Sequence, residues 1–170
     1  MAKLMDKTDI LKLHSKIYVG NLLIKMYYPS VIAFLNEKVG AEGARERLFQ
    51  VGQEVGRGFM NLFNPKTTDV KKMIYKFYKL MWNTTKNVKV KVIKGKHRIF
   101  YHVIDKKCGL CDPETVLEGL DIPCASIGGY FDACLEHISK ISPLPSYKVQ
   151  TIKSINTGDP HCEHVIEIAR

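Results

Sequence analysis

The spacing of apolar residues along the chain changes near residue 84. Before that point, apolar residues recur every three or four positions, which is the period of an amphipathic helix. We expect Pro29 to end the first helix, Gly40 the second and Asn64-Pro65 the third, with Thr67 or Thr68 capping a fourth. The predicted helices span residues 8–27, 30–39, 41–63 and 69–82.

After residue 84 the period falls to two, which is typical of strands. Val88, Val90 and Val92 alternate with Lys89 and Lys91, and a plausible tight turn follows them. The predicted strands span 88–92, 98–104, 147–155 and 162–168, with a helix over 124–141 and a short helical turn possible at 113–119. This order predicts an α+β fold, with helices packed on a mostly antiparallel four-stranded sheet.

The domain organisation follows from the same pattern. We expect an N-terminal helix over residues 1–29 and a single globular unit over residues 30–170. Within the long third helix, Gly52 and Gly56 are four residues apart and would let another backbone approach closely. The sequence leaves open whether that backbone belongs to the same chain or to the partner in a dimer.

The charge is distributed unevenly over the 170 residues. The formal net charge of +9 divides into +14 over residues 1–107 and −5 over residues 108–170. Segment 66–98 holds 11 basic residues and one acid, Asp69. A nucleic-acid-binding module is one interpretation, but the lysine faces carry few aromatic residues and Arg98 is the only arginine there. A solvated surface is therefore favoured over a nucleic-acid partner.

The sequence shows neither a membrane-spanning segment nor a secretory signal. No apolar run approaches the length of a membrane-spanning helix. The N-terminal stretch is interrupted by Asp6 and Asp9, so it does not look like a secretory signal. We expect a cytoplasmic protein with reduced cysteines and no membrane partner.

All five cysteines lie after residue 107. Cys108 and Cys111 enclose two residues directly after a predicted strand, a spacing that lets two thiolates face one tetrahedral metal ion. Gly109 relieves the tight turn between them. The same spacing also fits a redox pair, or thiols without any metal.

The other half of the site is less clear. Cys124 begins a predicted helix, and Cys162 and His164 share a strand face with two isoleucines, which predicts that the face is buried. Cys134 lies in mid-helix and is expected to pack as a small apolar residue. Four cysteines, Cys108, Cys111, Cys124 and Cys162, form a candidate zinc site, with His164 and His161 as alternative ligands. A site closed by four protein ligands is structural, because catalysis needs an open position.

Two cysteine-containing segments resemble the 4-vinyl-reductase domain family. The turn and strand GDPHCEHVI at 158–166 resembles the family's closing motif, and PCASIGGYF at 123–131 resembles its cysteine-then-glycine helix start. The helix containing VGQEVG at 51–56 is similar to an early glycine-bearing helix of the family. The similarity extends over about residues 30–168, and the chain looks most like the stand-alone archaeal hydrocarbon-binding members.

This resemblance implies a ligand-binding domain whose fold is shared with TRAPP-type vesicle-tethering subunits and with phenol-sensor domains. It also implies a homodimer, a pocket for a small apolar or aromatic molecule, and a zinc beside that pocket in the sensors. Cys124 and Cys162 fall on two metal-ligand positions of the sensors. Ser154 and Thr151 stand where the family usually has Cys and often has Glu, so Cys108 and Cys111 are the natural replacements.

The sequence is compatible with three functions. The first is a zinc-stabilised binding module that acts as sensor or carrier with a partner, and the second is a reductase-type enzyme with zinc near the pocket. No dinucleotide fingerprint, P-loop or nucleophile elbow is visible, so binding is favoured and no catalytic residue is assigned. The third is the basic nucleic-acid module. Candidate pocket aromatics are Phe59, Trp82, Tyr101 and Tyr130, each of which could equally be core, so no ligand-binding residue is assigned.

Overall fold

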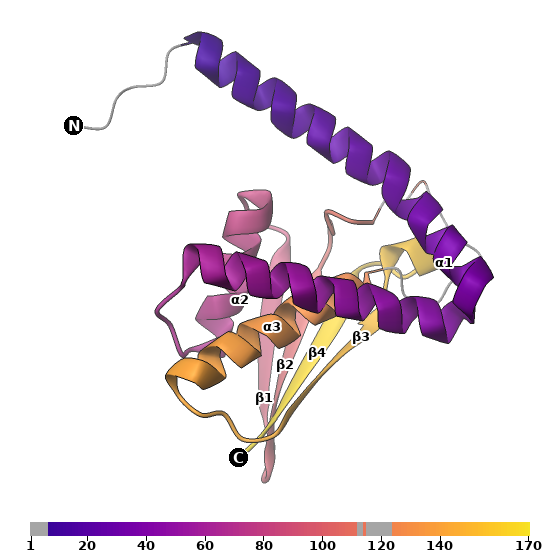
Figure 1. Cartoon of the computed structure of the whole chain (residues 1–170). Helices are drawn as coiled ribbons and strands as arrows, with labels where there is room; N and C mark the ends of the chain where they lie inside the picture. Colours follow the sequence, from indigo (N-terminus) through magenta and orange to yellow (C-terminus); the bar gives the residue numbers. More distant parts are fainter. Residues whose placement is uncertain (1–6, 112–113, 115–123) are drawn as a thin grey trace.

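The computed structural model describes residues 7–111, 114 and 124–170, and the possible helical turn at 113–119 lies almost wholly outside them. Three helices and four strands form the predicted α+β fold (Figure 1). They are α1 (Lys7–Phe63), α2 (Val70–Trp82), β1 (Val88–Lys94), β2 (Arg98–Asp105), α3 (Ala125–Ile141), β3 (Tyr147–Lys153) and β4 (Cys162–Ala169), with a short 3-10 helix (Ile155–Thr157) before β4.

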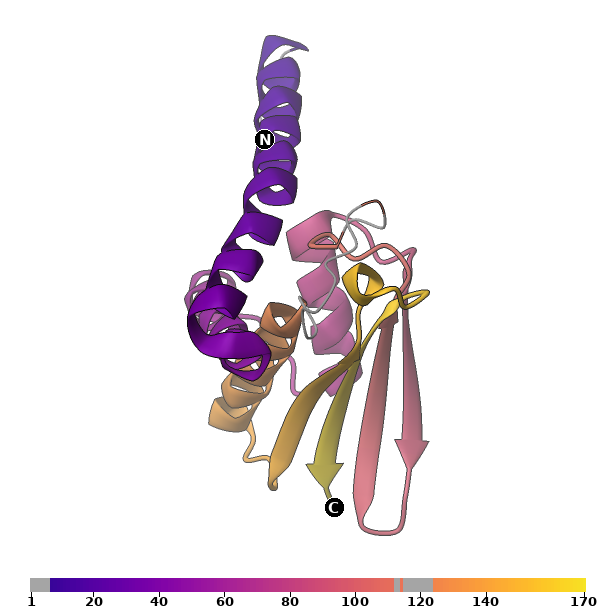
Figure 2. The same ribbon diagram turned by 90° about the vertical axis from the view of Figure 1, so that its right-hand side faces the viewer.

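The sheet has the strand order β1-β2-β4-β3, and every neighbouring pair is antiparallel. The helices that touch the sheet lie on one of its faces, and none of the helices described here lies on the opposite face (Figure 2). On the helix-facing side, His164 pairs with Val103 of β2 and with Thr151 of β3. Cys162 and His164 are both fully buried, which confirms the predicted burial of this strand face.

Helix α1 does not end at Pro29, so the predicted boundary there is wrong. The helix continues through Pro29, and its non-helical residue is Gly40 (φ 73°), where the sequence predicted a break. A proline inside a helix costs about 3 kcal/mol, and tertiary contacts offset that cost here. Ile32 is 1% exposed in a small cluster with Leu48 and Ala125. The domain division at residue 29 stays a prediction, because helix continuity alone does not define a domain.

The second half of α1 packs on α3 at glycine positions. A Cβ atom added to Gly52 would lie 2.0 Å from the carbonyl oxygen of Ser126, and one added to Gly129 would lie 2.0 Å from that of Phe49. At Gly56 the added atom would meet the Cβ of Ala133 at 2.7 Å. The close approach predicted for Gly52 and Gly56 is therefore made within the chain.

Helix α2 begins at Val70, one residue after the predicted start at residue 69. Asp69, not Thr67 or Thr68, is the N-cap, because its carboxylate accepts the backbone N–H of Lys72 at 2.9 Å. The inward face of α2 carries Phe77, which is 1% exposed at the centre of an aromatic cluster. The rings of Phe59, Tyr78, Trp82, Tyr130 and Phe131 lie with their centroids 5.2–6.3 Å from that of Phe77.

Three of the four candidate pocket aromatics thus pack around Phe77 in the core. No helix within the described residues is long and apolar enough to cross a membrane.

Candidate metal centre

Four cysteines from separate parts of the chain meet at one end of the sheet. Cys108 and Cys111 follow β2, Cys124 is the N-cap of α3, and Cys162 is the first residue of β4. Each is at most 7% exposed. The ligand atoms of Cys108, Cys111 and Cys162 all lie within 4.8 Å of one another, and the sulfurs of Cys111 and Cys162 are 3.5 Å apart.

Cys124 adjoins this group of three. Its thiol lies 3.8 Å from the carbonyl oxygen of Lys153, and hydrogen bonding with Cys108, Cys111 and Cys162 acts on its pKa. The four residues proposed from the sequence are therefore neighbours, with three in the tightest group and Cys124 beside them. Cys134 lies in α3 away from this group, and burial raises its pKa to about 12, so it stays a neutral thiol.

The turn that carries the first two cysteines is fixed from both sides. The backbone N–H of Cys111 donates to the carbonyl oxygen of Cys108 at 3.2 Å. Gly109 packs closely against the indole of Trp82, and a Cβ atom added at this position would lie 1.8 Å from the indole Nε1. Gly109 is thus required by the packing of Trp82 as well as by the turn.

Hydrogen bonds among the clustered thiols change their pKa values. Hydrogen bonds from Cys108, Cys124 and Cys162 stabilise the thiolate of Cys111 and lower its pKa. Cys108 has a raised pKa, first because it donates to Cys111 and also because it is buried. The backbone N–H of Ile155 donates to the sulfur of Cys162 at 3.4 Å. The thiolate is the form that binds metal.

Two polar residues, Ser154 and Asp105, lie beside the cysteine cluster. Ser154, which stands where the resembling family usually has a cysteine, places its Oγ 3.6 Å from the sulfur of Cys111. Asp105 is opposite Cys162 in the β2–β4 ladder, is 2% exposed, and accepts the backbone N–H of Lys107 at 3.0 Å. Burial raises the pKa of Asp105. Sequence reasoning missed Asp105, because only the register between β2 and β4 brings it to the site.

The two histidines proposed as alternative ligands make other contacts. His161 places Nε2 3.4 Å from a carboxylate oxygen of Glu163. His164 is fully buried, and its Nδ1 lies 2.9 Å from Thr151 Oγ1. Its Nε2 has no hydrogen-bond partner in the part of the chain that the structure describes. Burial lowers the pKa of His164 to about 4, so its ring is neutral at physiological pH.

The separations among the sulfurs of Cys108, Cys111 and Cys162 fit a tetrahedral thiolate site. Zinc binds thiolate sulfur at about 2.3 Å, which places the four sulfurs of a regular tetrahedron about 3.8 Å apart. The observed separation of 3.5 Å and the 4.8 Å limit bracket that value. At these distances the three cysteines could hold a metal ion.

A groove adjoins the elements that hold the cysteines. It has a volume of about 530 Å³ and runs between α1 and β3, with Phe49, Ala125, Val149, Thr151 and Ile152 among its walls. Ala125 directly follows Cys124, and Thr151 contacts His164, two residues after Cys162. A second, more open hollow of about 620 Å³ includes Tyr101 and the start of α2 and touches none of the cysteines.

Comparisons with known proteins give the fold and no family. No protein-family model matches the chain, and no curated protein matches it either. Among solved structures, subunit 3 of a trafficking protein particle complex from Naegleria fowleri, crystallised covalently bound to palmitic acid, matches with a TM-score of 0.64 and 17% identity. The match covers 90% of this chain and 96% of the subunit.

A second solved structure has the same architecture. It is the phenol-responsive sensory domain of the transcription activator PoxR with phenol, with a TM-score of 0.56 and 12% identity over 82% of this chain and 72% of that one. Both identities are low, so the likeness shows the fold alone. It confirms the two fold relatives that the sequence resemblance implied, while the 4-vinyl-reductase family itself is not shown.

Proposed function

We propose that this protein is a small-molecule-binding domain stabilised by one structural zinc ion, which Cys108, Cys111, Cys124 and Cys162 would hold. The observation that carries the proposal is the convergence of buried sulfurs from the loop after β2, the start of α3 and the start of β4. Without a shared ion, the four buried thiols would have few hydrogen-bond partners other than each other. A bound zinc would supply binding free energy that contributes directly to folding.

A four-sulfur set would favour binding over catalysis. Zinc with four protein ligands has no open position for water or substrate, whereas a reductase-type zinc enzyme would need one. Neither His161 nor His164 places a ring nitrogen within 4.8 Å of all three sulfurs of Cys108, Cys111 and Cys162, which favours cysteine ligands. The proposed role is therefore a sensor or carrier that works with a partner in the cytoplasm.

The ligand that we propose is small and apolar or aromatic, bound in the groove between α1 and β3. The groove volume of about 530 Å³ lies in the range of small-molecule sites. Phe49 and Val149 supply apolar walls. Phenol and palmitic acid in the two similar structures support ligands of this chemistry on this fold.

The groove and the cysteine cluster share structural elements, so ligand and metal would influence each other. Thr151 lines the groove and contacts His164, and His164 precedes the core residue Ile166 on the same strand as Cys162. A ligand that orders β3 would therefore stabilise the strand that begins at a metal ligand. This arrangement suits a domain whose metal maintains the pocket rather than reacts in it.

The same proposal includes a homodimer. Apolar side chains lie exposed along both halves of α1, at helical spacing: Tyr27, Val31 and Phe34 before Gly40, and Val51, Val55 and Leu62 after it. These residues are between 47% and 77% exposed in the single chain, which is unfavourable for stripes of this size. A second copy that covers them would explain both stripes.

The test combines metal analysis with a ligand titration on the full chain. Native mass spectrometry of protein purified without added metal should report one zinc per chain and a dimer. Phenol, followed by NMR, should shift resonances of Val149 and Ile152. Ile152→Trp should obstruct the groove and weaken phenol binding, whereas Ile93→Trp, at a similarly exposed strand position on β1, should not. Equal effects of both variants would contradict the assignment of the groove.

A further inference from the structure

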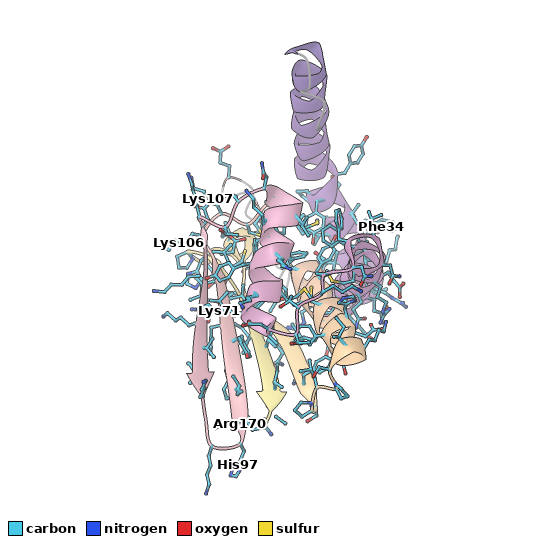
Figure 3. The ribbon with its side chains drawn as sticks, turned by 90° about the vertical axis from the view of Figure 1, so that its left-hand side faces the viewer. Phe34, Lys71, His97, Lys106, Lys107 and Arg170 are labelled. Carbon is cyan, nitrogen blue, oxygen red and sulfur yellow. The ribbon has the colours of Figure 1, made fainter. Side chains whose placement is uncertain are left out.

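Exposed lysines gather over α2 and the β1–β2 hairpin, on the side of the molecule seen in Figure 3. There Lys71 lies at the start of α2, and Lys106 and Lys107 lie at one end of the hairpin. We call this surface the lysine face. Its exposed lysines are Lys71, Lys72, Lys76, Lys79, Lys86, Lys89, Lys91, Lys94, Lys96, Lys106 and Lys107.

The positive charge of the lysine face is not compensated. Between Lys66 and Cys111 the acidic residues are Asp69 and Asp105. Asp69 is engaged as the N-cap of α2, and Asp105 is 2% exposed. None of the eleven lysines forms an ion pair with another described residue, although lysines elsewhere, such as Lys140 and Lys153, do.

Two rows of lysines on this face each end at an exposed aliphatic side chain. On α2, Lys72 and Lys76 are followed by Leu80 at helical spacing, and Leu80 is 45% exposed. On the outer side of β1, Lys89 and Lys91 are followed by Ile93, which is 53% exposed. Charge and exposed apolar area thus occur together in both rows.

A hydrogen bond fixes the two elements that carry these rows. The backbone N–H of Val90, on the edge strand β1, donates to the hydroxyl oxygen of Tyr75 on α2 at 3.4 Å. Tyr75 therefore places α2 beside the edge of the sheet. The lysine row of α2 and the row of β1 lie on the two sides of this edge, because Lys89 and Lys91 alternate with the buried Val90.

Protection of the sheet edge accounts for only part of this surface. Lysines on an edge strand prevent pairing with other chains, which gives Lys89 and Lys91 a purpose of their own. It does not explain the lysines of α2, because a helix has no open edge. It also does not explain Leu80 and Ile93, since exposed aliphatic residues would promote association rather than prevent it.

The composition of the face separates two kinds of anionic partner. Base recognition in nucleic acids relies on arginine and on exposed aromatic rings, and Arg98 is paired with Glu167. Anionic lipid headgroups need only cationic side chains, and aliphatic side chains among them enter the headgroup region. We propose that the lysine face binds the surface of a membrane that contains anionic lipids, as a peripheral contact, in contrast to the expectation from the sequence that the protein has no membrane partner.

The experiment measures binding of the full chain to vesicles. It should bind phosphatidylserine-containing vesicles at low salt and not pure phosphatidylcholine vesicles. Each lysine near an anionic surface contributes about fivefold in affinity, so the triple variant Lys72→Gln, Lys76→Gln, Lys79→Gln should bind at least about tenfold more weakly. The matched control, Lys38→Gln, Lys140→Gln, Lys148→Gln, removes the same net charge elsewhere and should bind within about threefold of the wild type.

A second pair of measurements separates lipid from nucleic acid. Leu80→Ser with Ile93→Ser keeps the charge and should weaken vesicle binding while leaving any binding to random duplex DNA unchanged. Equal losses in the two triple variants would overturn the proposal, because they would indicate an effect of net charge alone. Tighter binding to duplex DNA than to the anionic vesicles would overturn it as well, and so would no vesicle binding at low salt.

Discussion

The sulfurs of Cys111 and Cys162 lie 3.5 Å apart, although 51 residues separate them in the chain. The contact joins the loop after β2 to the first residue of β4, and Asp105 and Cys162 pair in the same ladder. A metal ion at this point would close a long loop at the same end of the sheet where α3 begins. Loss of the ion should therefore destabilise the start of α3 more than the turn of the β1–β2 hairpin.

Replacing one cysteine of the cluster should remove the metal. Cys162→Ser leaves three sulfur ligands and a weaker oxygen donor, so we expect zinc affinity to fall by more than about 100-fold, which exceeds the usual effect of changing a residue that only supports a ligand. The zinc content of the purified variant and its thermal midpoint should both decrease.

Cys134→Ala is the matched control for this change. Cys134 is equally buried but lies outside the cluster, so its replacement should leave zinc bound at the wild-type ratio and cost only packing. If Cys134→Ala also released the metal, the assignment of the ligands would be wrong.

The contact between α1 and α3 should not tolerate a methyl group at its glycines. Gly52→Ala and Gly129→Ala would each push a Cβ atom to 2.0 Å from a backbone oxygen, and backbone cannot move aside as a side chain would. We expect each variant to lose about 2 kcal/mol or more of unfolding free energy, as in other overpacked cores. Denaturant unfolding measures the change.

Gly58→Ala tests whether that loss comes from the contact. Gly58 is on the same helix, and nothing lies within 4 Å of the added methyl group. Alanine is the better helix former by about 1 kcal/mol, so this variant should be more stable than the wild type. A destabilised Gly58→Ala would point to a general intolerance of α1 to substitution.

Gly109→Ala should disturb the metal site through Trp82. The added Cβ atom would meet the indole nitrogen at 1.8 Å, so either the indole or the Cys108–Cys111 turn must shift. We expect zinc affinity to fall roughly 10- to 100-fold, as it does when residues that orient metal ligands are changed. Tryptophan fluorescence should change with it, because Trp82 is the one tryptophan of the chain. Normal zinc affinity with altered fluorescence would show that the indole moves and the turn does not.

The ion pair between α1 and α3 predicts a specific pH dependence. Glu136 accepts from Arg57 Nε at 2.8 Å and contacts Lys140 at 3.1 Å, and these contacts lower its pKa from 4.5. A lowered pKa in the folded state stabilises the protein above pH 4.5, and this stabilisation is lost as the pH falls through the folded-state pKa. Because Glu136 is partly exposed, Glu136→Gln should cost about 0.5 kcal/mol at pH 7 and almost nothing below that pKa.

Unfolding of the wild type and of Glu136→Gln in denaturant at a series of pH values measures this difference. Glu54→Gln is the control, since Glu54 also contacts Arg57 but its side chain is 75% exposed. A cost for Glu136→Gln that stayed constant down to acid pH would mean that packing, not charge, is responsible.

Periodicity predicted the strands of this fold well, because their alternation reflects one buried and one open face. The run Val88, Val90, Val92 and the burial of Cys162 with His164 both follow from it. The predicted helix end at Pro29 is wrong, since local propensity favours a break there while the buried Ile32 keeps the helix in place. The local pattern of apolar residues does not show how segments far apart in the sequence pack together.

The candidate site shows the same division. Spacing identified Cys108 and Cys111, and strand alternation placed Cys162 on a buried face. The register that puts Asp105 opposite Cys162, and the fit of Trp82 on Gly109, depend on three-dimensional contacts. The sequence therefore predicted that Cys108, Cys111 and Cys162 meet, and the structure was needed to find what surrounds them.

Metal content, measured by native mass spectrometry on the wild type and on Cys162→Ser, tests the central proposal most directly. We predict one zinc ion per wild-type chain and none in the variant. Replacement of the zinc by cobalt should give the strong thiolate-to-metal absorption of a tetrahedral four-sulfur site. A metal-free wild type that folds with the same stability in the presence of a chelator would contradict the account.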